Sequence, residues 1–161
     1  MSEITETQKG IVAENLVARH LIIESRGRLS PFRAVADDGG IDLLIYDKET
    51  GKALPLQIKS RTKTLRCNPK NVHFEIRLAT FNENQDAYVL AVFLDEGLAH
   101  LKRAWLIPMR ELEQVAARRT HKLVIRPSKD MNSKDKCTPY RCEGISEVTR
   151  RLIDSFDATN G

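Results

Sequence analysis

The chain has 161 residues, of which 41% are hydrophobic and 30% are charged, a balance that excludes an intrinsically disordered protein. This length suits one domain with a sizeable core, so we expect residues 1–161 to form a single domain. The longest apolar run, residues 87–94, is too short to span a bilayer, and the first residues lack the basic and apolar segments of a secretory signal. We therefore expect a cytoplasmic protein without a membrane partner.

The net charge of +4 is mild, but the basic residues are unevenly distributed. Residues 57–72 contain five Lys and Arg and no acid, and residues 99–161 contain thirteen Lys and Arg against eight Asp and Glu. Such local excess suits a polyanionic partner, because each neutralised phosphate releases counterions. An ordinary solvated basic surface explains the same pattern equally well. The three cysteines argue against a disulfide framework, and a zinc site is disfavoured because structural zinc needs closely spaced ligand pairs.

The first predicted element is a helix over residues 7–25. Six residues recur at three- and four-residue spacing along it, and Gly27 supplies a stop just beyond; the six are Ala13, Leu16, Val17, His20, Leu21 and Glu24. A strand is predicted over residues 28–36, where Pro31 confines it to a sheet edge or to a strand start. The turn-forming residues 37–40 follow, and Asp37 and Asp38 are interpreted as turn formers rather than ligands.

The rest of the chain predicts a mixture of strands and helices. A hairpin is expected from strands at 41–46 and 53–61. The later predicted elements are strands at 72–78, 87–94, 99–107 and 121–126, helices at 108–119 and 145–156, and a polar loop at 128–143. This order predicts an α/β or α+β fold with a mixed sheet flanked by helices.

Strand alternation places polar residues of the predicted hairpin on one face. Successive side chains of a strand point to opposite faces, so Asp42 is separated from Leu43, and Gln57 and Lys59 are separated from Ile58. If the apolar face enters the core, Asp42 comes to lie beside Gln57 and Lys59. A carboxylate, an amide oxygen and an ammonium group would then converge on one spot.

This combination of groups suits metal-dependent phosphodiester chemistry. Carboxylate and amide oxygens are hard ligands that suit Mg²⁺ or Mn²⁺, and such an ion polarises a phosphodiester and lowers the pKa of a bound water. The ammonium group of Lys59 can orient that water and stabilise developing negative charge. Glu14, at the edge of the apolar face of the first helix, could supply another carboxylate.

Two segments carry a family resemblance. Residues 39–60 contain Gly-Gly-Ile-Asp-Leu-Leu-Ile-Tyr, a short loop and Leu-Pro-Leu-Gln-Ile-Lys-Ser, and they resemble the core of the PD-(D/E)xK nuclease superfamily, most closely its Mrr-like restriction endonuclease domains. In those domains the position before x-Lys is often Gln. The preceding helix, Lys-Gly-Ile-Val-Ala-Glu through Leu21, resembles the first helix of the family. The resemblance covers roughly residues 9–94.

The resemblance implies a restriction-endonuclease-like fold and metal-dependent cleavage of DNA. Carried over by position, Asp42 is the central metal ligand, Gln57 takes the place usually held by Glu, Lys59 is the catalytic lysine and Glu14 is the helix carboxylate. The backbone carbonyl of Ile58 is expected to help bind the metal. Ile41 stands where the motif nominally has Pro.

Gln57 leaves open whether the site cuts DNA. With an amide in place of a carboxylate, the protein is either an endonuclease that gains metal affinity from bound DNA, in restriction, defence or repair, or a nucleic-acid-binding module of the same fold that does not cut. A third hypothesis is an interaction or oligomerisation domain. Nucleases of this type often pair to cut two strands, so a homodimer is also considered.

Several further residues are candidates for contacting nucleic acid. Ser60, Arg61 and Lys63 follow the site directly and could hold phosphates. The pair His73 and Glu75 shares a strand face and is a weaker catalytic candidate. The polar loop over residues 130–141 is interpreted as a solvated, mobile loop, with a nucleic-acid-contacting flap as the alternative.

Overall fold

The structure of the protein is a computed structural model that describes residues 3–36, 39–82 and 86–159. Its centre is a six-stranded sheet in the order β1-β2-β3-β5-β6-β9. Strands β3 and β5 run parallel, and every other neighbouring pair is antiparallel. The strands are β1 (Leu29–Arg33), β2 (Leu43–Asp47), β3 (Ala53–Arg61), β5 (Tyr88–Leu94), β6 (Leu101–Pro108) and β9 (Arg141–Cys142). The predicted mixed sheet is therefore confirmed, and Pro31 lies in the edge strand, as expected.

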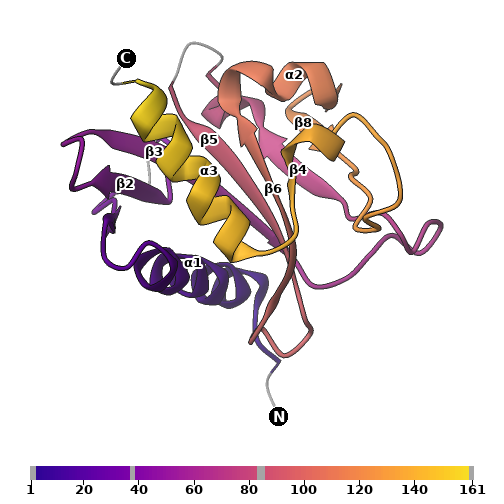
Figure 1. Cartoon of the computed structure of the whole chain (residues 1–161). Coiled ribbons are helices and arrows are strands. Elements are labelled where there is room, and N and C mark those ends of the chain that lie inside the picture. The colour runs from indigo at the N-terminus through magenta and orange to yellow at the C-terminus, as the bar shows by residue number, and fades with distance from the viewer. Residues whose placement is uncertain (1–2, 37–38, 83–85, 160–161) are drawn as a thin grey trace.

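The two faces of this sheet carry different layers (Figure 1). Helices α1 (Glu6–Glu24) and α3 (Ile145–Ala158) cover one face, and a second sheet in the order β4-β8-β7 packs with α2 (Leu112–Val115) on the other. Its strands are β4 (Phe74–Arg77), β7 (Ala117–Arg118) and β8 (Lys122–Ile125), and single 3₁₀ turns lie at η1 (Leu78–Thr80), η2 (Met109–Glu111) and η3 (Thr138–Tyr140). No helix in the described part of the chain combines the length and apolar character of a membrane-spanning segment.

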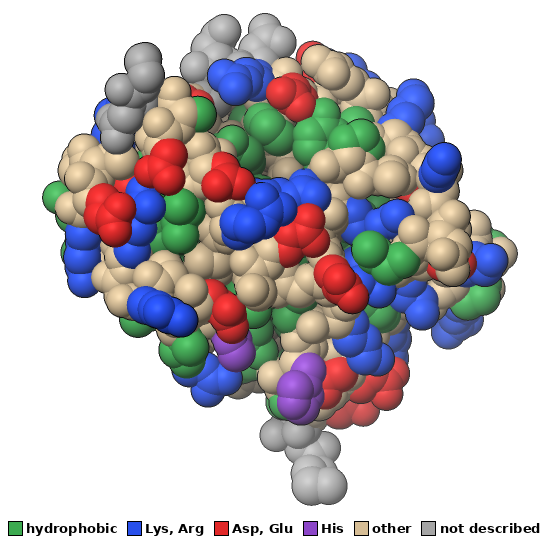
Figure 2. Space-filling model, viewed as in Figure 1, with side chains coloured by type: hydrophobic (Ala, Val, Ile, Leu, Met, Phe, Trp, Pro, Cys, Tyr) green, Lys and Arg blue, Asp and Glu red, His purple; other side chains and the backbone are tan. Residues whose placement is uncertain are grey.

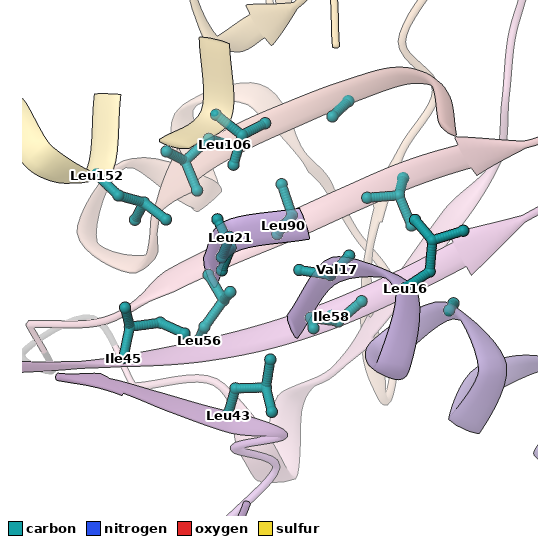
Figure 3. Close-up of a cluster of buried hydrophobic side chains, with 14 of the residues drawn as sticks. Leu16, Val17, Leu21, Leu43, Ile45, Leu56, Ile58, Leu90, Leu106 and Leu152 are labelled. Atoms are coloured by element: carbon teal, nitrogen blue, oxygen red, sulfur yellow. The ribbon is translucent and has the colours of Figure 1, made fainter. Parts of the chain in front are cut away.

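The strand alternation divides the interior into two cores. Leu43 and Ile45 of β2 and Leu56 and Ile58 of β3 belong to one buried cluster with residues of α1 and α3, and Figure 3 shows this cluster with Val17 and Leu21 of α1 and Leu152 of α3. The opposite face packs against the small sheet around Trp105, which is fully buried. A polar side chain that alternates along a strand with side chains of the first core therefore points to the opposite face of the sheet. The candidate site lies on that face.

Helix α1 begins where its N-terminal hydrogen bonds are satisfied. Thr5 accepts from the Gln8 backbone amide while the Gln8 side chain accepts from the Thr5 amide, a capping box. The buried residues are Ala13, Leu16, Val17 and Leu21. The predicted helix is confirmed, but His20 and Glu24 are not among its buried residues, so the buried stripe is narrower than the sequence suggested.

The predicted helix at 108–119 is wrong beyond Val115. Helix α2 ends at Val115, and Ala116 turns the chain into an extended conformation. Ala117 and Arg118 then pair with β8, and the Arg119 amide donates to the Lys122 carbonyl at 2.8 Å. Tertiary pairing overrides the helix propensity of this alanine- and arginine-rich segment.

The predicted irregular segment at 128–143 is held by one buried arginine. Arg141 is 7% exposed, and its guanidinium donates to four backbone carbonyls of the preceding loop, those of Ser128, Asp130, Met131 and Ser133, at 2.8–3.4 Å. Arg141 itself lies in β9 and pairs with Trp105. The segment is thus fastened to the sheet, and Arg141 is not the exposed nucleic-acid contact that a flap would require.

A carboxylate on the small sheet gives a pH-dependent stability. The Lys122 Nζ lies 2.6 Å and the His73 Nε2 2.9 Å from the Glu75 Oε1. These two hydrogen bonds lower the pKa of Glu75 from 4.5 to about 2. Because the folded-state pKa is depressed, the stabilisation is complete above pH 4.5 and is lost as the pH falls toward about 2. We expect Glu75→Gln to be less stable than wild type at pH 6 but equal to it near pH 2, measured by urea unfolding. A stability difference that stays constant across this range would contradict the assignment.

Candidate active site

The β2–β3 hairpin brings Asp42 against the middle of β3. Leu43 pairs with Leu56, and the Asp42 amide donates to the Leu56 carbonyl at 3.0 Å. The Asp42 carboxylate then accepts a short hydrogen bond of 2.6 Å from the backbone amide of Ile58. Because Ile58 is the residue between Gln57 and Lys59, the carboxylate is fixed next to both halves of the predicted motif.

Gln57 is a buried amide with a defined orientation. Its side chain is on a residue only 4% exposed, and its Nε2 donates to the Thr80 hydroxyl at 3.1 Å. That hydroxyl donates its single proton to the Arg77 carbonyl at 3.0 Å, so it can only accept from Gln57. The Gln57 Oε1 is therefore left as a buried acceptor, and it has no hydrogen-bond partner among the residues that the structure describes. A buried, unsatisfied carbonyl oxygen is costly unless a ligand completes it.

Gly40 closes the site from the side of the turn before β2. Its φ of +68° is in the region that favours glycine. A Cβ added there would lie 2.5 Å from the Thr80 Cβ and 2.9 Å from the Gln57 Nε2. Gly40 is thus required by its backbone conformation and by the close approach of Thr80 and Gln57, which hydrogen-bond each other.

Replacing Gly40 by Ala should disturb the site as well as the stability. We expect Gly40→Ala to lower the free energy of unfolding by about 2 kcal/mol, because it adds a clash to an unfavourable φ. Gly51→Ala is the matched control, since Gly51 has φ of +70° but no described atom within 4 Å of the added Cβ. Denaturant unfolding of the two variants separates crowding from strain, and equal losses would show that the contact with Thr80 and Gln57 is unimportant.

Lys59 lies on the same face of β3 as Gln57. Gln57 pairs with Val89 and Lys59 with Ala91, and both partners belong to the second core. Lys59 is half-buried. The alternation predicted for the two motif residues is therefore found, with Leu56 and Ile58 facing the first core.

Glu14 is held by a different partner. Its carboxylate pairs with Arg33 of β1 at 3.2 Å, and Arg33 also donates to Asn15 at 2.6 Å. Within residues 3–36, 39–82 and 86–159, no three His, Cys, Asp or Glu side chains gather as a metal site. A cation at Asp42 would therefore depend on one carboxylate and on the neutral oxygen of Gln57.

The predicted phosphate-binding residues continue along β3. Ser60 and Arg61 are half-buried, and Lys63 is exposed just beyond the strand. The Arg61 guanidinium donates to the Ser60 carbonyl at 2.9 Å. Asp37 and Asp38, interpreted as turn formers, lie outside the described residues.

Sequence reasoning missed the role of Thr80, and it assigned Gly40 only to a turn. Thr80 lies 23 residues after Gln57, in a 3₁₀ turn that leads away from the second sheet, and nothing in its local sequence indicates a contact with β3. A signal existed only for Gly40, because glycine is the usual residue where the backbone has a positive φ or is closely approached.

Comparison with solved structures shows what the fold resembles. The chain is similar to the bacterial homing endonuclease I-Ssp6803I, with 18% identity, 98% coverage of both chains and a TM-score of 0.66. A second solved structure, the Holliday junction resolvase Hjc from Archaeoglobus fulgidus, aligns with 16% identity over 81% of this chain and 97% of the resolvase, with a TM-score of 0.45. No protein-family model matches the sequence, and no curated protein matches it significantly. The predicted restriction-endonuclease-like fold, a mixed sheet flanked by helices, is therefore confirmed.

Proposed function

We propose that this protein is a metal-dependent endonuclease that hydrolyses DNA phosphodiester bonds. The observation that carries the proposal is the buried Gln57 Oε1, which has no partner among the described residues. Gln57 is the neighbour of Ile58, whose backbone amide anchors the Asp42 carboxylate. An oriented acceptor that receives no hydrogen bond from residues 3–36, 39–82 and 86–159 suits a cation. The similarity of the fold to a homing endonuclease supports the same class of activity.

The residues present fit Mg²⁺ or Mn²⁺. Both ions prefer oxygen ligands, and the Asp42 carboxylate and Gln57 Oε1 are the two candidates, with the Ile58 carbonyl as a third. When bound, the ion would polarise the phosphodiester and lower the pKa of a water molecule. Glu14 is proposed as a further carboxylate, and its contribution should be smaller because binding would compete with Arg33.

The chain itself would supply orientation and charge. The Ile58 amide fixes one oxygen of Asp42, and Thr80 fixes the Gln57 amide, so both ligands are positioned before substrate arrives. We propose that the Lys59 ammonium orients the attacking water and stabilises negative charge that develops on the phosphate. These roles correspond to those implied by the PD-(D/E)xK superfamily, with Gln57-x-Lys59 as an Mrr-like variant of its motif.

A second candidate function is binding of nucleic acid without cleavage. It is favoured by the neutral Gln57, since the described residues contain no cluster of three acidic or other strong metal ligands. Such a protein would bind DNA with an affinity that falls steeply with salt, yet leave it intact with any divalent ion.

One experiment separates the two functions. Plasmid, linear and branched DNA are incubated with the protein and Mg²⁺ or Mn²⁺, with a chelator as control. The proposal expects cleavage that requires the ion and that Lys59→Ala reduces at least about 100-fold. Binding without cleavage would support the second candidate, and equal cleavage by wild type and Lys59→Ala would contradict the role assigned to Lys59. If both DNA strands are cut, we expect two copies of the chain to pair, which size-exclusion chromatography with DNA can detect.

A further inference from the structure

We propose that a basic groove beyond the end of β3 and β5 binds the sugar–phosphate backbone of nucleic acid. The groove consists of two adjoining hollows of about 440 and 620 Å³. They share Phe93, Lys102 and Lys129, and we call them together the Phe93 groove. This inference rests on the proposed function only because that function identifies the bound polyanion as nucleic acid. Its test does not depend on cleavage.

Two lysines form the shared part of the groove. The Lys102 Nζ lies 5.6 Å and the Lys129 Nζ 5.9 Å from the centre of the Phe93 ring. Phe93 is only 5% exposed, so its ring supports the two ammonium groups and is not available for stacking on a base. Phosphate oxygens are therefore the groups that suit this surface, and recognition of base edges is not expected from it.

The groove carries more basic than acidic residues. Lys63 lines one hollow, and Lys70 and Arg103 line the other. Three acidic residues also line the groove, and two of them already have partners within the protein. Asp130 accepts a hydrogen bond from the Asn132 amide and lies 3.6 Å from the Lys70 ammonium group. Asp95 accepts hydrogen bonds from the amides of Ala99 and His100. The third, Glu96, is exposed. Figure 2 shows Lys and Arg side chains gathered on the side of the molecule where the small sheet and the following loop lie.

Hydrogen bonds within the protein hold the loop that carries Lys129. Arg103 donates to the Lys129 carbonyl at 3.0 Å, and the buried Arg141 holds the carbonyls of the residues on both sides of it, Ser128 and Asp130. Lys129 is thus presented from a rigid backbone, and only its side chain needs to be ordered on binding. Such preorganisation lowers the entropic cost of association.

The groove lies further along β3 and β5 from the candidate active site. Gln57, Lys59 and Arg61 share one face of β3, and Arg61 pairs with Phe93, which in turn pairs with Arg103. Side chains on one face of a strand are spaced by about 6.6 Å, so Lys59 and Arg61 lead in short steps toward the groove. This proximity favours nucleic acid over an acidic peptide, because a nucleic-acid strand bound at the candidate site would pass near the groove.

Binding without cleavage tests the groove. The affinity for a labelled short DNA duplex and for its single strand is measured by fluorescence anisotropy in a chelator, between about 0.05 and 0.2 M salt. For Lys102→Ala/Lys129→Ala we expect at least about tenfold weaker binding and a logarithmic salt slope smaller by about 2. The matched control is Lys48→Ala/Arg110→Ala, which removes two exposed charges near the opposite end of β3 and β5. It should change the affinity less than about twofold. Lys102→Arg/Lys129→Arg keeps the charge and should retain wild-type binding, which separates charge from packing.

Each outcome decides the proposal. Equal affinities for the groove variant and the control variant would overturn it, and so would an absence of DNA binding by wild type. Competition by polyglutamate as effective as that by DNA at equal charge would also overturn it, because the groove would then be a general anion surface. Wild-type binding that the groove variant loses, combined with no cleavage under any divalent ion, would support the groove and contradict the nuclease function.

Discussion

Replacing Asp42 by Asn is expected to lower the rate of metal-dependent DNA cleavage by about 100- to 1,000-fold. The substitution removes the one carboxylate that the Ile58 amide anchors beside the Gln57-x-Lys59 segment. An Asn side-chain oxygen can still accept the Ile58 hydrogen bond, so the fold should be retained while the negative charge is lost. The measurement is a single-turnover cleavage assay, in which every enzyme molecule starts with bound DNA.

The control for Asp42→Asn is a variant that removes one carboxylate charge at another position. Asp154 lies on the exposed side of α3, where it pairs with Arg150 at 2.9 Å. Asp154→Asn should retain the fold, since exposed ion pairs contribute little to stability. It should therefore leave the cleavage rate within about twofold of wild type. If Asp42→Asn cleaves as fast as this control, Asp42 is not part of the reaction centre.

The largest loss of stability is expected from Arg28→Ala. Asp47, at the end of β2, has a fully buried side chain and accepts two hydrogen bonds from Arg28 at 2.8 and 3.0 Å. Arg28 holds the pKa of this carboxyl well below its usual range, and it also reaches Asp157 of α3 at 2.6 Å. Removing Arg28 would leave a buried charge that accepts hydrogen bonds from Thr50 and the Glu49 amide among the described residues, at a cost of about 3 kcal/mol.

Thermal and denaturant unfolding measure this loss. For a chain of this length about 3 kcal/mol corresponds to a fall in Tm of about 6–12 °C. Arg150→Ala is a suitable control, because its ion pairs with Glu147 and Asp154 are on an exposed helix surface. If Arg28→Ala loses no more stability than Arg150→Ala, the buried Asp47 does not depend on its partner.

The sequence predicts the hairpin of the candidate site well because alternation is a local property. Leu43 and Ile45 in β2 and Leu56 and Ile58 in β3 are buried in one core, so Asp42 and Gln57 must point to the other face. The same reasoning places Pro31 in an edge strand. In these segments the period of the side chains and the tertiary structure agree, and short-range information is sufficient.

The parts that sequence reasoning missed depend on contacts between distant segments. The sequence around residues 117–118 favours a helix, but these two residues pair with β8. The sequence around Arg141 favours a loop, but Arg141 is buried against four backbone carbonyls. Thr80 reaches Gln57 only because the second sheet packs on the first. In each case the determining partner is distant in sequence or belongs to another layer, so the local pattern could not predict the contact.

The binding of Mn²⁺ to the free protein and to its complex with DNA, followed by electron paramagnetic resonance, tests the central claim most directly. The claim is that Asp42 and the unsatisfied Gln57 oxygen hold a divalent cation. We predict weak binding to the protein alone, tighter binding when DNA is present, loss of binding in Asp42→Asn, and at least about tenfold tighter binding in Gln57→Glu because it adds a negative charge. Mn²⁺ binding that neither substitution changes would contradict the claim.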